Sequence, residues 1–147
     1  MPYDDEISPY ALPEPSPVVD EFARKVIGAA IEVSSALGPG HLEEVYQEAL
    51  AIEMELRGIP FERQVPVSVL YKGVKVGDGK LDFLVGGVLI VEVKAVPTLI
   101  AIHGVQVESY LSITGHELAL LLNFNVLKLK DGGIRRIIAS RLRNSQS

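Results

Sequence analysis

The sequence contains no cysteine and only three histidines among its 147 residues. The lack of cysteine excludes disulfides, thiol nucleophiles, iron–sulfur clusters and cysteine-ligated zinc, and so few histidines argue against a histidine-rich metal site. No apolar run is long enough to span a bilayer, and the chain opens on acidic residues and proline rather than on a basic and apolar leader. We therefore expect a cytoplasmic protein without a membrane partner.

Charge is distributed unevenly along the chain. Hydrophobic residues make up 48% and charged residues 22%, which is typical of one globular domain with a single core. The net charge of −5 argues against a protein that coats nucleic acid by bulk charge. Residues 128–147 nevertheless hold six basic residues and one acid. This basic end either solubilises the C-terminus or contacts phosphate groups.

Proline marks the first boundary in the chain. Five of the nine prolines lie within residues 1–17, where they block helical and strand hydrogen bonding. We interpret 1–17 as an extended acidic arm, 18–138 as a single domain and 139–147 as a basic flexible tail. A homo-oligomer held together by the arm is one further possibility for the assembly.

The spacing of apolar residues predicts three helices. Residues 18–37 and 41–57 each carry one apolar face and are followed by glycine and proline. A third helix, which follows Pro97 and ends at about Thr114, is apolar on most sides, so we expect it to be deeply buried.

Alternating and continuous apolar runs predict the strands. Pro66 places the strand 61–71 at an edge or a bulge. The nearly continuous apolar run 118–124 is typical of a strand covered on both faces. The strands are predicted at 61–71, 80–85, 89–94 and 118–124, with a final hairpin made by 126–130 and 134–138. The element order α-α-β-β-β-α-β-β predicts an α/β fold, a mixed sheet flanked by helices.

The register of the hairpin 80–94 decides which side chains meet. With a two-residue turn, Val85 would pair with Val88, and each face of the hairpin would mix charged and core residues. With a three-residue loop, Val85 pairs with Leu89 and one face becomes wholly apolar. A one-residue slip moves every side chain to the other face, so we favour the second register, in which Gly87 takes a positive φ.

This second register gathers Asp82, Glu92 and Lys94 on one patch beside the core. Two carboxylates at a cross-strand distance repel each other, and a divalent cation relieves the conflict. Oxygen ligands favour Mg²⁺ or Mn²⁺ over Zn²⁺. Lys94 would then orient water or stabilise negative charge on a phosphoryl group. The alternative is a surface ion pair of Asp82 or Glu92 with Lys80 or Lys94.

Two helices add candidate site residues. Glu43, one turn before Tyr46, either reaches the same cation or is a first-turn acid favoured by the helix dipole. His103, Gln106 and Tyr110 recur at helical spacing on the third helix. They either line the site or, as a core histidine and two internal hydrogen-bonding groups, satisfy buried partners.

Three blocks in this order resemble the GxxExxY protein family, which is placed in the PD-(D/E)XK nuclease superfamily. They are Gly40-x-x-Glu43-x-x-Tyr46, then Leu81-Asp82 with Glu92-Val93-Lys94-Ala95, then His103-x-x-Gln106-x-x-x-Tyr110-Leu111. The resemblance covers about 26–138 and implies a restriction-endonuclease-like core.

The resemblance also implies roles for individual residues. Asp82, Glu92 and Glu43 would hold Mg²⁺ or Mn²⁺, Lys94 would be the catalytic lysine, and Gln106 matches a helix glutamine of nuclease relatives. Leu81 stands where the superfamily name has proline, a departure that leaves the metal ligands in place.

Two functions therefore compete at this stage. The leading hypothesis is a Mg²⁺-dependent nuclease that hydrolyses phosphodiester bonds of DNA or RNA. The alternative is a non-catalytic module on a nuclease fold that binds nucleic acid or protein, because a fold by itself does not fix an activity.

Overall fold

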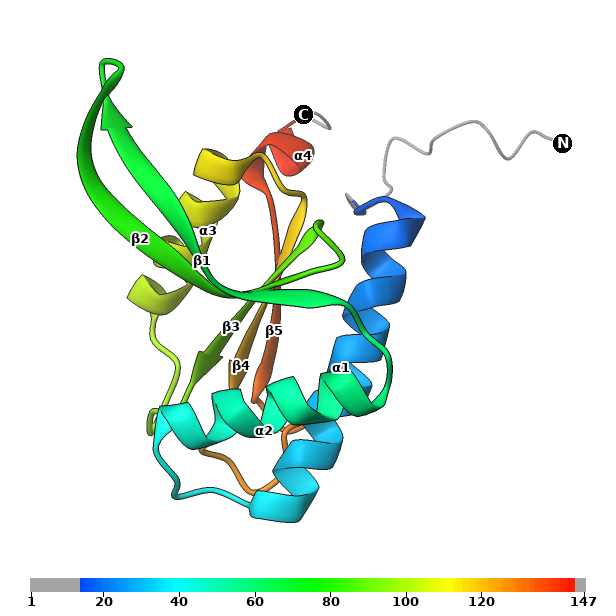
Figure 1. Ribbon diagram of the computed structural model, residues 1–147. Helices are drawn as coiled ribbons and strands as arrows, with labels where there is room; N and C mark the ends of the chain where they lie inside the picture. The colour runs from blue at the N-terminus through cyan, green and yellow to red at the C-terminus, as the bar shows by residue number, and fades with distance from the viewer. Residues whose placement is uncertain (1–13, 145–147) are drawn as a thin grey trace, which may run out of the picture.

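Five strands form one sheet in the order β1-β2-β3-β4-β5, in which β3 and β4 run parallel and all other neighbours are antiparallel. The computed structural model describes residues 14–144 of the chain. Along the chain the elements are α1 (Pro17–Leu37), α2 (Glu43–Leu56), β1 (Phe61–Tyr71), β2 (Val74–Val85), β3 (Leu89–Lys94), α3 (Ala101–Thr114), β4 (Leu118–Asn123), β5 (Ile134–Ile138) and α4 (Ser140–Asn144). The sheet is mixed and flanked by helices, so the predicted α/β class is confirmed (Figure 1).

The helices lie on both faces of the sheet (Figure 1). One buried cluster joins α1 and α2 to one face, through side chains such as Val26, Leu50 and Val91. A second cluster joins α3 to the other face, through Val107 and Leu121 among others. Every residue of β4 is buried, which confirms the prediction that this strand is covered on both faces.

β1 and β2 form a long antiparallel ribbon whose far end projects beyond the rest of the sheet (Figure 1). β1 lies at the edge of the sheet, as Pro66 predicts. β2 begins at Val74 rather than at residue 80. The sequence prediction was too short because Lys72 and Gly73 both take positive φ values and close a two-residue turn, which keeps the following residues paired with β1.

The predicted hairpin of 126–130 with 134–138 is wrong. Residues 126–130 form no strand, and β5 pairs with β4 instead. Two contacts of the loop between β4 and β5 explain the difference. Leu129 packs into the core below α1, and Asn123 N–H donates to the carbonyl of Gly133, which carries the β4 ladder directly into β5.

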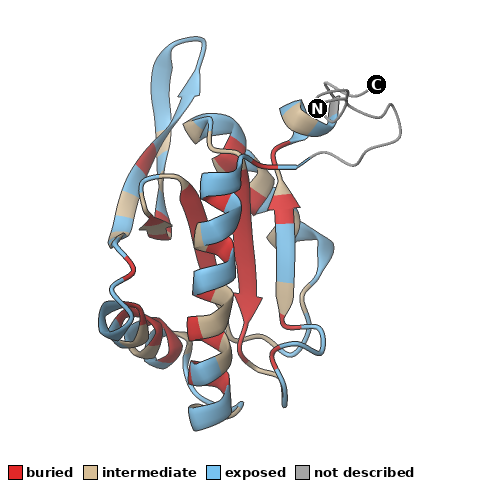
Figure 2. Cartoon of the chain, turned by 90° about the vertical axis from the view of Figure 1, so that its right-hand side faces the viewer, coloured by how far each residue is buried: buried red, intermediate tan, exposed pale blue. Residues whose placement is uncertain are grey.

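α3 is less buried than its composition predicts. Only Val107 and Leu111 are buried in this helix, whereas Ile102 is 60% exposed and Val105 is 55% exposed. α3 packs on the sheet along one stripe, through Val107 and Leu111, whereas the other face of the sheet is covered by α1, which lies in front in Figure 2. An apolar helix can therefore lie on a surface when nothing covers its second side.

The region predicted as a flexible tail contains a short helix. Ala139 is buried, and α4 follows it. Arg141 donates to the carbonyls of Gly115 and His116, at 2.6 and 3.1 Å, and so holds α4 against the end of α3. Residues 145–147 and most of the predicted arm, 1–13, lie outside the described residues. Within residues 14–144, no helix is long and apolar enough to cross a membrane.

Candidate active site

The turn between β2 and β3 sets the register of the site. Val85 lies opposite Leu89, and Phe83 lies opposite Val91. Gly86 and Gly87 both take positive φ values, 60° and 72°. The structure therefore contains the predicted three-residue loop, with Gly87 in the left-handed region that glycine tolerates best.

Asp82 and Glu92 exchange hydrogen bonds across the two strands. The backbone N–H of Asp82 donates to Glu92 Oε2 at 2.7 Å, and the backbone N–H of Val93 donates to Asp82 Oδ2 at 2.8 Å. The regular pairing of β2 with β3 stops at Phe83. Each carboxylate thus bridges to the neighbouring strand where the two strands separate, and among the described residues its second oxygen has no hydrogen-bond partner.

Burial governs the protonation of both acids. Glu92 is only 7% exposed, and this burial, together with the nearby charge of Asp82, raises the pKa of Glu92 to about 8. Burial also raises the pKa of Asp82, although the Val93 N–H and the positive charges of Lys94 and Arg63 oppose the rise. A nearby cation would therefore stabilise the ionised forms of both acids.

Lys94 and Glu43 complete a group of four charged side chains. The ammonium of Lys94 lowers the pKa values of Glu43, Asp82 and Glu92. Burial raises the pKa of Glu43, and the charge of Asp82 raises it further. The first turn of α2 therefore brings Glu43 within electrostatic reach of the two strand acids.

The three acids do not form a finished metal cage. Within residues 14–144, no group of three or more Asp, Glu or His side chains is placed to hold one ion. Glu43 accepts a hydrogen bond from Gln47 Nε2 at 3.4 Å. Asp82 and Glu92 are thus the close pair, and Glu43 stands beside them.

Three further residues at the site escaped the sequence analysis. Gln64 Nε2 donates to Gln47 Oε1 at 3.3 Å, which continues the chain of amides that starts at Glu43. Arg63 pairs with Glu48 at 2.7 Å, and its guanidinium lies 5.4 Å from the centre of the Phe83 ring. These contacts join α2 and β1 to the site, and no local sequence pattern reveals them.

Gln64 takes an unusual backbone conformation, with φ of 52°. The left-handed region disfavours β-branched side chains most strongly. Gln64→Val is therefore expected to lower the free energy of unfolding by about 1–3 kcal/mol, whereas Gln64→Gly should stay close to wild type. Urea unfolding followed by circular dichroism measures both, and a valine variant as stable as the glycine variant would contradict the prediction.

The three candidate residues of α3, His103, Gln106 and Tyr110, have different surroundings in the structure. Burial and the charges of Glu92 and Asp82 raise the pKa of Tyr110, although a hydrogen bond with the Lys80 backbone opposes the rise, so the hydroxyl lies against β2 within electrostatic reach of the acids. His103 Nδ1 instead accepts the backbone N–H of Ile100 at 3.0 Å, which caps the start of α3. Gln106 is exposed one turn before Tyr110. Tyr110 is thus the one of the three that the structure brings within electrostatic reach of the acids.

Tyr46, which the sequence predicts as a possible site-lining residue, makes its contacts with the loop between α1 and α2 and with the core. Its hydroxyl donates to the carbonyl of Gly38 at 2.6 Å and accepts the backbone N–H of His41 at 3.2 Å. Its ring stacks on Phe124 with centroids 4.9 Å apart. Tyr46 therefore fastens the loop between α1 and α2 to the core.

Tyr46→Phe keeps this packing and removes the two hydrogen bonds. It is expected to lower the free energy of unfolding by about 1–2 kcal/mol. Tyr71→Phe, at an exposed position on the projecting ribbon, is the matched control and should change stability little. Equal unfolding midpoints in urea for the two variants would contradict the role given to the Tyr46 hydroxyl.

Two half-buried to buried acids on adjacent strands, a lysine two residues on and a helix-borne acid lie together on a mixed sheet flanked by helices, an arrangement consistent with a restriction-endonuclease-like fold. The family model of the PD-(D/E)XK nuclease superfamily matches residues 20–137. The chain belongs to this superfamily, whose nucleases generally use divalent metal ions and act on nucleic acids. No curated protein and no solved structure gives a significant match.

Proposed function

We propose that the protein is a nuclease that uses Mg²⁺ or Mn²⁺ to hydrolyse phosphodiester bonds of DNA or RNA. The observation that carries this proposal is the exchange of hydrogen bonds by Asp82 and Glu92 where β2 and β3 separate, with the charge of Lys94 within electrostatic reach of both acids. Membership in the nuclease superfamily supports the same chemistry.

The donor set of the site suits a small divalent ion. Asp82 and Glu92 each have one oxygen without a hydrogen-bond partner among the described residues, and both acids are partly or fully buried. Hard oxygen donors of this kind bind Mg²⁺ and Mn²⁺. When bound, the ion would supply positive charge that polarises a phosphate oxygen and acidifies water. Glu43 is the proposed third ligand, and it accepts a hydrogen bond from Gln47.

The remaining side chains would handle the substrate. Lys94 lies within electrostatic reach of all three acids, so its ammonium can position the attacking water or stabilise charge on the phosphoryl group. Tyr110 lies within electrostatic reach of Asp82 and Glu92 and can donate a hydrogen bond from its hydroxyl. Gln106, exposed on the same side of α3, is proposed to orient Lys94 or a nucleotide.

A cleavage assay with a metal-ligand variant tests the proposal. Wild-type protein should cut single- or double-stranded DNA or RNA in Mg²⁺ or Mn²⁺ and stop in excess chelator. Asp82→Asn should reduce the cleavage rate at least about 100-fold. An amide binds a divalent ion far more weakly than a carboxylate does, and the proposed hydrolysis depends on that ion. Asp78→Asn, an exposed acid on the same strand paired with Lys75, is the matched control. Metal-independent cutting, or equal rates for the two variants, would overturn the proposal.

One observation favours a second candidate, a non-catalytic module that binds nucleic acid or protein. The described residues contain no ready three-ligand metal group, and burial, together with the charge of Asp82, raises the pKa of Glu92 to about 8, which disfavours the ionised form that a metal ion needs. Calorimetric titration with Mn²⁺ at pH 8.5 separates the candidates. No heat of Mn²⁺ binding together with retained binding of an oligonucleotide would favour the module over the nuclease.

A further inference from the structure

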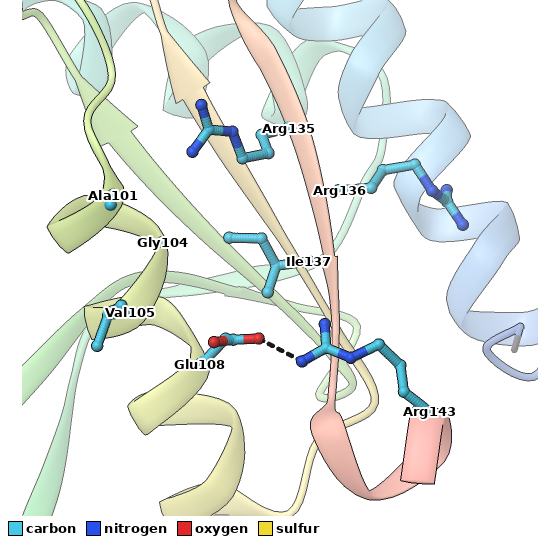
Figure 3. A pocket seen from close by; sticks show the side chains of 8 residues that line it. All are labelled: Ala101, Gly104, Val105, Glu108, Arg135, Arg136, Ile137 and Arg143. Atoms are coloured by element: carbon cyan, nitrogen blue, oxygen red, sulfur yellow. Dashed lines mark hydrogen bonds and ion pairs between the residues drawn. The ribbon is translucent and has the colours of Figure 1, made fainter. Parts of the chain in front are cut away.

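A basic groove lies between α3, β5 and α4, on the side of α3 away from the acids. Its volume is about 240 Å³, and the residues that line it include Gly104, Glu108, Arg135, Arg136, Ile137 and Arg143. Figure 3 shows Arg135 reaching into the groove toward the start of α3, while Arg143 enters from the opposite end and meets Glu108. Two guanidinium groups thus share one small hollow.

Arg135 differs from the other arginines around it because it has no partner within residues 14–144. Arg136 pairs with Asp20 at 3.0 Å, and Arg143 pairs with Glu108 at 2.6 Å. Arg136 also borders the groove, but Figure 3 shows its guanidinium pointing away from the groove, toward α1. The groove therefore holds one guanidinium that is free and one that an exposed carboxylate steadies, and an exposed ion pair of that kind is readily exchanged for a better anion.

Gly104 keeps the floor of the groove open. A β-carbon added at this position would lie 3.8 Å from Arg135 Nη1 and 3.9 Å from Ile137 Cδ1, which are ordinary contacts. Alanine would therefore fit, and any longer side chain would enter the groove. Glycine makes a helix less stable than alanine does. At position 104 this lower helix stability comes together with open space in the groove.

The groove opens on the same face of the sheet as the acids. Glu92 lies opposite Leu121, and Leu121 lies opposite Arg135, so the three residues form one row across β3, β4 and β5. Residues opposite each other in a sheet point to the same side, and two strand spacings amount to about 10 Å. α3 lies over the middle of this row, with Tyr110 on the side of the acids and Gly104 on the side of the groove.

We propose that this groove binds a phosphate group through Arg135 and Arg143. Arginine presents a planar fork of donors that matches phosphate, and such charge-assisted bonds are about twice as strong as neutral ones. The phosphate comes from a nucleic-acid backbone or from a free phosphate or nucleotide. The assignment to a backbone rests on the proposed function and would give an acidic protein a local grip on its substrate, because phosphate contacts position a nucleic acid without reading its sequence.

Charge-matched variants at adjacent positions test the groove. Binding of a fluorescent single-stranded or duplex oligonucleotide is measured by anisotropy in excess chelator, at several salt concentrations. Arg135→Ala should weaken binding about tenfold, as expected for one lost charge-assisted contact, and should lower the salt slope by about 0.7–0.9. Arg136→Ala removes the same charge on the opposite face of β5 and should change the affinity less than about twofold.

Filling the groove gives a test that changes no charge. Gly104→Leu should abolish the phosphate site, whereas Gly104→Ala should bind as the wild type does. Inorganic phosphate, followed by shifts of the Arg135 and Gly104 amide signals in NMR, reports the site directly. Saturable phosphate binding that Gly104→Leu removes, without oligonucleotide binding, would support the site and assign it to free phosphate or a nucleotide.

The outcomes also separate this inference from the proposed nuclease. Equal loss in Arg135→Ala and Arg136→Ala would show attraction by bulk charge and overturn the groove. Metal-dependent cleavage with unchanged affinity in both Arg135→Ala and Gly104→Leu would likewise overturn the groove and leave the nuclease intact. Phosphate binding in the groove without any metal-dependent cleavage would support the groove and contradict the nuclease.

Discussion

Alanine in place of Lys94 is expected to slow phosphodiester hydrolysis by a factor of about 10²–10⁴, the usual range for a lost proton-transfer or charge-stabilising group. The ammonium of Lys94 acts on Glu43, Asp82 and Glu92 through its charge. It follows the buried acid of β3 by two residues and is itself partly buried, so it lies on the same face of the strand. Its loss should remove the group that faces water or the phosphoryl oxygens.

The same variant should keep its divalent ion. Lys94 repels a cation, so its removal should leave Mn²⁺ affinity unchanged or somewhat higher, while Asp82→Asn should lower that affinity. Calorimetry with Mn²⁺ and a single-turnover cleavage assay on the same samples give the two readouts. Lys80→Ala, at an exposed lysine on β2, removes the same charge as a control. Full activity in Lys94→Ala, or loss of the ion together with activity, would contradict the role given to Lys94.

The pairing of Asp82 with Glu92 could be predicted because the apolar alternation along both strands fits only one length of the turn between them. Leu81, Phe83 and Val85 alternate with polar or less buried residues, and only a three-residue loop places the apolar positions of both strands together. The turn then fixes Asp82 and Glu92 opposite each other, and the structure shows this register. Local patterning with period two therefore carries information across a short turn.

The rest of the site depends on contacts between distant segments. Gln47 and Gln64 meet only because α2 crosses the end of β1, and Gln64 takes a left-handed φ that its residue type does not signal. The exposure of Ile102 and Val105 has a similar cause, because composition reports how apolar a helix is and not how many of its sides are covered. The pairing of β5 with β4 likewise depends on a distant contact, because Leu129 packs into the core and the segment around it does not form a strand.

Glutamine in place of Glu92 is expected to make the metal-free protein more stable at alkaline pH and to flatten its pH dependence. The pKa of Glu92 is about 8 in the folded protein and near 4.3 in an unfolded chain. The folded state therefore holds a proton that the unfolded state releases between these values. The stability that this proton supplies is complete below a pH of about 4 and is lost as the pH rises through about 8.

The size of the effect follows from the same linkage. One pKa unit corresponds to about 1.4 kcal/mol, so the rise of the Glu92 pKa from near 4.3 to about 8 costs the folded protein about 5 kcal/mol of stability by pH 8.5. Glutamine resembles the protonated acid in shape and still offers an oxygen to the backbone N–H of Asp82, so the variant should lie within about 1 kcal/mol of wild type at pH 5 and exceed it by several kcal/mol at pH 8.5. Urea unfolding in chelator at both pH values measures the difference.

Divalent metal should reverse the comparison at alkaline pH. A cation that binds ionised Glu92 competes with its proton, so Mn²⁺ should stabilise wild type more at pH 8.5 than at pH 5, by an amount that grows with its concentration. Glu92→Gln should gain much less at either pH. Glu44→Gln, an exposed acid on the first turn of α2, controls for the change in net charge. A stability that does not depend on pH in wild type, or an equal gain from Mn²⁺ in wild type and Glu92→Gln, would mean that this carboxyl group neither holds the proton nor meets the ion.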